Sequence, residues 1–354
     1  MPAATVTRQF ASRSADTFDF RDILYEKAEG VARVTLNRPE AYNAYSTTAL
    51  EELAAAFRDA SFDDAVGVII FTGAGHKAFC TGGDVKEYAE NYVAVPRDYW
   101  KYMALFRSYI ESILNTGKPV IARLNGMAVG GGNESQLACD LTVMAQHATI
   151  KQVGTKVGSV ACGGSTQWLP LVVGDKRARQ ILMLNEPVSS AQALDWGLVN
   201  WVVPTVRRGA DWVSEATPAE VRQAQRREGG LCIDLSRLDE VTNDVARRLL
   251  DSFPECSRYT KQQVNFWKDL AWHSTVRHAQ DWLSLHYVCW EPVEGMNAFV
   301  EKRAPDFAGL RRAAAEGGSS EAPWGPPVRT CGACGARSLP RSHEFCGSCG
   351  QPLS

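Results

Sequence analysis

The stretch LNGMAVGGGNE at residues 124–134 decides the fold, because an apolar segment here runs straight into a glycine triplet and a glutamate. A second stretch of this kind, KAFCTGGDVKEY at residues 77–88, carries its own pair of glycines. Glycine turns can leave a backbone N–H group unpaired and pointing outward. Two such amides that meet at one point would form an oxyanion hole, which stabilises a negative oxygen by about 3 kcal/mol per donor.

Segments typical of strands and of helices alternate on both sides of these turns. Strand-like apolar runs occupy residues 30–39, 66–73, 119–126 and 141–145. Helical patterns occupy residues 46–60 and the segment in which Tyr102, Phe106, Tyr109, Ile110 and Ile113 recur at helical spacing. The alternation predicts an α/β fold.

The composition is that of an ordinary globular protein, with 354 residues, 45% hydrophobic and 22% charged. The formal net charge of −2 gives no overall positive field for nucleic acid or for an anionic membrane. No apolar run reaches the roughly 18 residues that a membrane-spanning helix needs, and the N-terminus does not resemble a signal peptide. We therefore expect a cytoplasmic protein with no nucleic-acid or membrane partner.

Four motifs in this order resemble the crotonase (enoyl-CoA hydratase/isomerase) superfamily, over residues 20–310. They are LNRPEAYNAY at 36–45, KAFCTGGDVKEY at 77–88, LNGMAVGGGNE at 124–134 and EGMNAFVEKR at 294–303. The resemblance implies a spiral of repeated ββα units. It also implies a helical C-terminal region that holds trimers together, which can pair into hexamers.

The same resemblance assigns roles to individual residues. Gly83 and Gly131 match the two oxyanion-hole amides, and Glu134 matches the first of the two glutamates of hydratases. The positions that it implies for binding coenzyme A or the rest of the acyl-CoA substrate are Arg38, Ala41, Lys86, Tyr88, Ser159, Phe299 and Lys302. Of these, Phe299 and Lys302 belong to the C-terminal helix that reaches the coenzyme A of a neighbouring subunit.

The chain departs from ordinary hydratases at the second glutamate, where it has Gly154. The naphthoate-synthase branch also has glycine there, but its additional aspartate is replaced here by Ala161. The closest resemblance is to the 6-oxocyclohex-1-ene-1-carbonyl-CoA hydrolases, through YNAYSTTAL at 42–50, VGSVACGG at 157–164 and LLDSFPEC at 249–256. Those enzymes add water to a cyclic enone thioester and then hydrolyse a ring C–C bond.

The C-terminus carries a second, independent signal. Cys331 and Cys334 form one Cys-x-x-Cys pair, and Cys346 and Cys349 form another. Four thiolates at this spacing suit a tetrahedral structural zinc ion, with glycines that allow the tight turns between the ligands. The sequence therefore predicts a small zinc ribbon, which can also serve as a docking module for a protein partner.

The predicted organisation and the competing functions follow from these signals. The divisions are an N-terminal arm at 1–19, a spiral core at 20–203, a polar, mostly exposed insertion with little strand pattern at 204–231, a helical region at 232–316, a flexible linker at 317–327 and the ribbon at 328–354. The first functional hypothesis is a ring-opening acyl-CoA hydrolase. The alternatives are an enoyl-CoA hydratase or isomerase with a single glutamate, and a non-catalytic acyl-CoA-binding scaffold.

Overall fold

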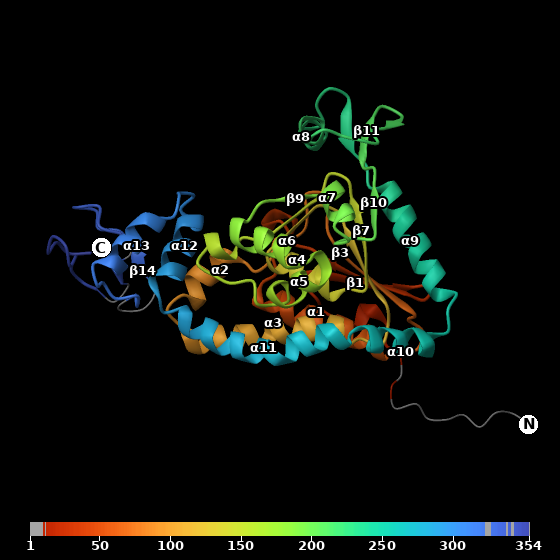
Figure 1. The fold of residues 1–354 in the computed structure, drawn as a ribbon, viewed down its shortest axis with the longest axis horizontal. Coiled ribbons are helices and arrows are strands. Elements are labelled where there is room, and N and C mark those ends of the chain that lie inside the picture. The colour runs from red at the N-terminus through yellow and green to blue at the C-terminus, as the bar shows by residue number, and fades with distance from the viewer. Residues whose placement is uncertain (1–9, 11, 323–326, 338, 341–342, 354) are drawn as a thin grey trace, which may run out of the picture.

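The structure is a computed structural model that describes residues 10, 12–322, 327–337, 339–340 and 343–353. Two sheets and the helices around them form the body of the molecule (Figure 1). Most of the N-terminal arm expected at residues 1–19 lies outside the described residues. The part that is described includes a short 3-10 helix, η1 (Ala15–Thr17).

The larger sheet has six strands in the order β1-β2-β3-β5-β7-β10. They are β1 (Ile23–Ala28), β2 (Val31–Leu36), β3 (Val68–Gly73), β5 (Val120–Leu124), β7 (Leu141–Ala145) and β10 (Trp201–Val203). The first two strands pair antiparallel, and every other pair is parallel. All residues of β3 and β5 are buried, as expected for parallel strands covered on both faces.

The smaller sheet places the two glycine turns side by side. Its strands are β4 (Ala78–Cys80), β6 (Met127–Val129), β8 (Thr149–Lys151) and β9 (Val188–Ser189), in that order. The first three run parallel. The turn at 81–84 follows β4, and the glycine triplet follows β6. Because these neighbouring strands run parallel, both turns lie at the same end of the sheet.

Helices surround the two sheets. The longer ones are α1 (Thr47–Phe62), α3 (Pro96–Leu114), α9 (Ser236–Leu250), α10 (Pro254–Val264), α11 (Phe266–His286) and α12 (Trp290–Val300). The shorter ones are α2 (Val85–Glu87), α4 (Gly131–Ala138), α5 (Ser165–Val173), α6 (Asp175–Arg179), α7 (Ser190–Asp195) and α13 (Phe307–Ala315). Other helical turns are η2 (Pro39–Ala41), η3 (Tyr88–Tyr92), η4 (Gly154–Lys156) and η5 (Gln180–Leu184). The predicted helix at 46–60 corresponds to α1. Ser46 caps the N-terminus of this helix, because its side chain accepts a hydrogen bond from the Ala49 amide.

Residues 204–231 contain more regular structure than the sequence suggests. A three-stranded sheet forms from β11 (Val206–Arg208), β12 (Asp211–Trp212) and β13 (Leu231–Ile233), and α8 (Pro218–Arg226) packs on it. Val206, Ala224 and Leu231 form a small core of their own, and the unit projects from the body in Figure 1. Strands of two or three residues are too short to show the alternation by which sequence patterns reveal strands.

The beginning of the predicted linker is attached to the body rather than free. The Trp290 amide donates to the Ser320 carbonyl at 2.9 Å, and the Ala322 amide donates to the Val288 carbonyl at 2.8 Å. The flexible linker was also predicted to include residues 323–326, which are not among the residues that the structure describes. Beyond them, β14 (Pro327–Arg329) pairs with β15 (Leu339–Pro340). Among the described residues, no helix combines the length and the apolar character needed to span a membrane.

Candidate active site

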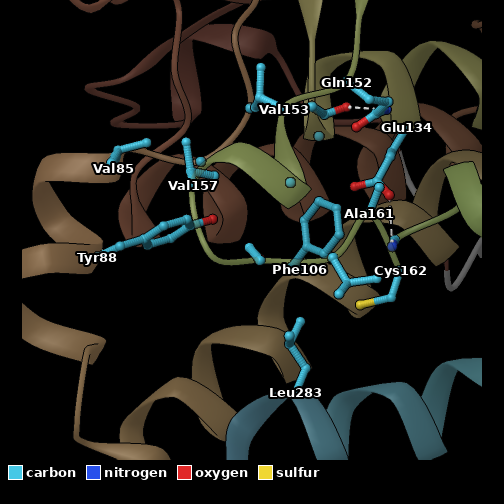
Figure 2. A pocket seen from close by; sticks show the side chains of 18 of the residues that line it. Val85, Tyr88, Phe106, Glu134, Gln152, Val153, Val157, Ala161, Cys162 and Leu283 are labelled. Carbon is cyan, nitrogen blue, oxygen red and sulfur yellow. Dashed lines mark hydrogen bonds between the residues drawn. The ribbon is translucent and has the colours of Figure 1, made fainter. Parts of the chain in front are cut away.

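One cavity brings together five of the residues singled out in the sequence. Gly83, Tyr88, Gly131, Glu134 and Ser159 all line it. Apolar side chains from several elements complete the wall, among them Val85, Met103, Phe106, Val157, Leu283 and Met296. In Figure 2 the Tyr88 hydroxyl points toward the cavity and Glu134 lies on its opposite side. The cavity is therefore mostly apolar, with a few polar groups gathered around the two glycine turns.

The two glycine turns touch each other at the cavity. A Cβ atom built on Gly82 would lie 2.9 Å from the Gly131 nitrogen, and Gly82 and Gly130 both have positive φ angles, of 89° and 56°. Among the described residues, no protein acceptor takes a hydrogen bond from the amide of Gly83 or Gly131. The Gly131 amide also opens α4, where unpaired N–H groups favour a negative charge. This arrangement can stabilise an oxyanion.

Glu134 sits one turn into α4 and lines the same cavity as the two glycine amides. Its Oε1 atom accepts hydrogen bonds from the Gly163 amide at 2.8 Å and the Ser165 amide at 3.3 Å. No described residue donates to its Oε2 atom. Burial raises the pKa of Glu134 to about 7, although the two amides act in the opposite direction. A carboxyl group with this pKa is suited to act as a general base near neutral pH.

The position of the missing second carboxylate is closed to a side chain. A Cβ atom on Gly154 would lie 2.9 Å from the Ser159 carbonyl oxygen, so any larger residue there would push the 154–160 loop outward. Gln152 is the nearby polar residue of the cavity, and its amide nitrogen donates to the Ser165 hydroxyl at 2.6 Å. Glu134 is therefore the single carboxylate among the described residues that line this cavity.

The remaining five predicted binding residues lie outside the cavity. Arg38 is held within the fold by Asp84 at 3.0 Å and by the Ala44 carbonyl at 2.6 Å. Ala41 ends η2. Lys86 is exposed and lies 3.9 Å from Glu90. Phe299 is 59% exposed at the end of α12, and Lys302 follows it on the surface. Neither residue lines the cavity of its own chain.

Two residues of the site were not identified from the sequence. Gly163 orients the Glu134 carboxylate through its amide, and a Cβ atom there would lie 2.8 Å from Glu134 Oε2. Tyr45 lines the cavity from the segment before α1. Both belong to motifs that were used only as landmarks, VGSVACGG and YNAY. The one sequence feature that could have indicated Gly163 is that it begins a pair of glycines after an apolar loop.

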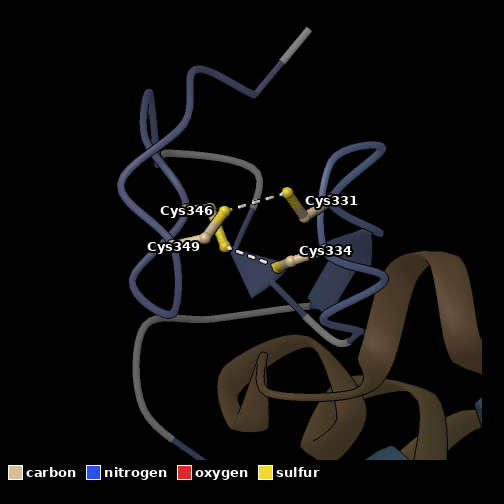
Figure 3. A group of neighbouring side chains, drawn as sticks. All are labelled: Cys331, Cys334, Cys346 and Cys349. Atoms are coloured by element: carbon tan, nitrogen blue, oxygen red, sulfur yellow. Dashed lines mark hydrogen bonds between the residues drawn. The ribbon is translucent and has the colours of Figure 1, made fainter.

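The four C-terminal cysteines converge on one point, and all of their sulfur atoms lie within 4.8 Å of one another. Cys331 Sγ lies 3.7 Å from Cys349 Sγ, and Cys334 Sγ lies 3.6 Å from Cys346 Sγ (Figure 3). Ligands about 2.3 Å from a tetrahedral zinc would be spaced at about 3.8 Å, whereas a disulfide requires about 2.05 Å. The four residues thus fit a structural zinc ion.

Comparisons with known proteins show which sequences and folds this chain is similar to. A sequence model of the family described as enoyl-CoA hydratase/isomerase matches residues 26–224. A 6-oxocyclohex-1-ene-1-carbonyl-CoA hydrolase of Geobacter metallireducens is 37% identical, over 84% of this chain and 84% of the relative. A protein of the same name from Thauera aromatica is 36% identical, over 83% of this chain and 84% of the relative.

Solved structures share the fold. An enoyl-CoA hydratase/isomerase from Xanthobacter autotrophicus Py2 aligns with a TM-score of 0.63 and 27% identity, over 84% of this chain and 94% of that one. An enoyl-CoA hydratase from Mycobacterium avium subsp. paratuberculosis aligns with a TM-score of 0.65 and 24% identity, over 81% and 98%. Because its sequence identity is lower, the second comparison shows only that the fold is shared.

Proposed function

Because this chain belongs to the enoyl-CoA hydratase/isomerase (crotonase) family of enzymes, we propose that it is an acyl-CoA hydrolase that opens a ring. Its substrate is a cyclic enone carried as a coenzyme A thioester. The observation that carries the proposal is the pairing of one carboxylate, Glu134, with two free amides, at a site where Gly154 closes the position of a second carboxylate. Two relatives named 6-oxocyclohex-1-ene-1-carbonyl-CoA hydrolase support the same reaction.

The first step is the addition of water to the carbon–carbon double bond. Glu134 accepts a proton from water, and the oxygen attacks the β-carbon of the enone. The electron pair moves onto the thioester oxygen, which the Gly83 and Gly131 amides stabilise as an enolate. Glu134 then returns its proton to the α-carbon, so one carboxylate completes the hydration.

The second step cleaves the ring with another water molecule. Glu134 again takes a proton, and the new hydroxide adds to the ring ketone. The tetrahedral intermediate collapses to a carboxylic acid, and the electrons of the broken C–C bond pass into the thioester enolate. The same two amides hold this enolate until Glu134 protonates it. One water is consumed and the carboxylate is regenerated.

The rest of the acyl-CoA thioester binds at the mouth of this cavity. Arg38, Ala41 and Lys86 lie on the segments that flank the glycine turn at 81–84 and are proposed to lie near the nucleotide. Phe299 and Lys302 of a neighbouring copy are proposed to complete that site, because both are exposed on the C-terminal helical region. The protein therefore requires at least one neighbouring copy for full activity.

We expect the purified protein to behave as a homotrimer or as a hexamer made of two trimers. Large apolar side chains are exposed on α5, α10 and α11, namely Leu171, Val264, Phe266, Trp267, Leu270 and Leu285. Apolar surface of this extent is typical of a permanent interface. Light scattering on the eluting protein at micromolar concentration would test this, and a fully active monomer would contradict it.

The rate should depend on pH through Glu134. A base with a pKa of about 7 is ionised above that value, so kcat/KM should be constant at higher pH and fall tenfold per unit at lower pH. A profile from pH 5.5 to 9 with a saturable thioester measures the midpoint. A profile that stays flat down to pH 5.5, as expected for an ordinary glutamate with a pKa of about 4.3, would contradict the role given to the buried carboxylate.

A panel of thioesters would test the proposed substrate class. We expect turnover of a cyclic enone thioester with a kcat/KM at least a hundredfold above that of a linear 2-enoyl-CoA. Comparable turnover of the linear compound, with no ring opening, would favour the hydratase alternative, since an oxyanion hole and one base also suit simple hydration. The panel thus separates the two enzymes directly.

The ribbon is proposed to hold one structural zinc ion through Cys331, Cys334, Cys346 and Cys349. All four ligands are protein sulfurs, so no coordination position is left for water or substrate. Its proposed role is to bind a protein partner, because it lies on the part of the chain that follows the catalytic domain. Retention of a partner by the full chain and not by the truncated chain would test this role.

A further inference from the structure

Tyr45 has a hydroxyl group at the active-site cavity that the fold itself does not use. The residue is only 2% exposed and lines the active-site cavity. None of the described residues forms a hydrogen bond with its hydroxyl group. A buried phenol usually has a partner, because leaving the group unpaired costs about 1–3 kcal/mol. A ligand in the cavity would supply the missing partner.

The position of Tyr45 links the two halves of the oxyanion hole. Its amide donates to the Gly82 carbonyl at 2.9 Å, and its carbonyl accepts from the Asp84 amide at 3.1 Å, so its backbone is fixed beside Gly83. Its hydroxyl group reaches Gly131, where an added Cβ atom would overlap it. The hydroxyl therefore lies directly against Gly131, the residue that opens α4.

The ring is held firmly in this position. It stacks on Phe106, with centroids 5.5 Å apart and planes 20° apart, and it lies 6.1 Å from the ring of Tyr109. Burial, together with the nearby Tyr88, Cys80 and Glu134, raises the pKa of Tyr45 well above its usual value. The hydroxyl group thus stays protonated and can donate one hydrogen bond.

The other two tyrosines that line the cavity, Tyr88 and Tyr99, have hydroxyl partners in Tyr102 and Tyr287. The Tyr88 hydroxyl lies 2.6 Å from that of Tyr102. Tyr287 lies 3.4 Å from the Ser159 hydroxyl and stacks on Tyr99. Among the described tyrosines that line the cavity, Tyr45 is thus the one whose hydroxyl has no partner within the protein, whereas Tyr88 shares one hydrogen bond with Tyr102 in which either hydroxyl can be the donor.

We propose that the Tyr45 hydroxyl donates a hydrogen bond to the ring ketone of the acyl group and so makes the site specific for acyl groups with an oxygen at that position. This inference rests on the proposed function. When the thioester oxygen lies between the Gly83 and Gly131 amides, a ketone on the neighbouring ring carbon can turn its own oxygen to the same side. That side is where the hydroxyl lies.

The hydrogen bond would act in the ring-opening step. Water loses a proton to Glu134 and bonds to the ketone carbon, and the ketone π electrons move onto the oxygen that Tyr45 holds. As the C–C bond breaks, its electron pair passes to the thioester enolate and the oxygen regains its double bond. Tyr45 donates a hydrogen bond throughout and transfers no proton.

The first test compares Tyr45→Phe with wild type on two substrates. On the cyclic enone thioester, kcat/KM should fall by about 10²-fold, as for other oxyanion donors. Hydration of crotonyl-CoA, which has no ketone, should stay within about threefold. Tyr25→Phe is the matched control, because its buried hydroxyl bonds to Asp59 at 2.7 Å outside the cavity, and it should change neither rate. Equal losses on both substrates, or no loss, would overturn the proposal.

The second test does not depend on turnover. In the Glu134→Gln background, calorimetry compares 2-oxocyclohexanecarbonyl-CoA with cyclohexanecarbonyl-CoA, which differ only in the ketone. The ketone compound should bind about tenfold more tightly, and adding Tyr45→Phe should remove this preference. An unchanged preference would refute the role of Tyr45. If wild type opens no ring while the preference depends on Tyr45, the proposed reaction is wrong and the binding role stands.

Discussion

Replacing Glu134 with glutamine lowers kcat by about 10²- to 10⁴-fold and leaves thioester affinity within about threefold of wild type. The amide keeps the shape of the side chain, and its oxygen can still accept from the Gly163 amide that now binds Oε1. What is lost is the basic oxygen that faces the cavity. Steady-state kinetics and calorimetry with a thioester would measure the two quantities separately.

Glu52→Gln is the matched control for this variant. Glu52 is also a buried glutamate, and its two oxygens accept hydrogen bonds from the Arg21 and Asp22 amides, both at 2.9 Å, outside the cavity. Its replacement should leave kcat unchanged. Activity of Glu134→Gln within about threefold of wild type would show that another group is the base.

The stability of Glu134→Gln provides a further check. Folding raises the pKa of this carboxyl group, so the protonated form is favoured in the fold and ionisation costs stability as pH rises from about 4.5 to 7. Glutamine carries no such cost. At pH 8 the variant should therefore melt at the same temperature as wild type or higher, which separates a lost base from a damaged fold.

Loss of the metal should unfold the ribbon and leave the catalytic domain intact. We expect one zinc per chain in the full-length protein and none in a chain that ends after Ala322, the last residue attached to the body by the hydrogen bond to Val288. A segment this small depends on its metal for folding, and structural zinc contributes roughly 10–16 kcal/mol in small metal-binding peptides. Metal analysis of the two proteins, with parallel kinetics, would measure both effects.

Cys346→Ser tests the same site without truncation. It removes one of the four sulfurs, so the zinc content should fall and protease should cleave the chain after residue 322. Cys256→Ser is the control, because Cys256 is an exposed free thiol on α10, away from the cluster. A metal-free wild-type protein would refute the zinc site. A truncation that abolishes turnover without unfolding the core would refute a purely structural role.

Much of the core was visible in the sequence because its signals are local. The apolar runs at 66–73, 119–126 and 141–145 correspond to β3, β5 and β7, since fully buried parallel strands are continuous apolar segments. The motifs of the family were also local, and the family assignment was confirmed. The four cysteines were recognisable by their spacing alone, and their sulfurs do meet at one point.

The parts that were missed depend on contacts between distant segments. Tyr45 is a landmark in the sequence, and only the fold places its hydroxyl against Gly131, far along the chain. Gly163 acquires its role because α5 brings the preceding loop onto the carboxylate of α4. In residues 204–231, pairing between segments more than twenty residues apart forms a sheet from strands too short to show a pattern.

The most direct test of the central claim is mass spectrometry of the product formed from 6-oxocyclohex-1-ene-1-carbonyl-CoA in ¹⁸O-labelled water. The account predicts an opened chain that has gained two water molecules, with one labelled oxygen in a hydroxyl group and one in a new carboxylate. Glu134→Gln protein should give almost none of it. A product that has gained a single water molecule, with the ring intact and no labelled carboxylate, would contradict the claim.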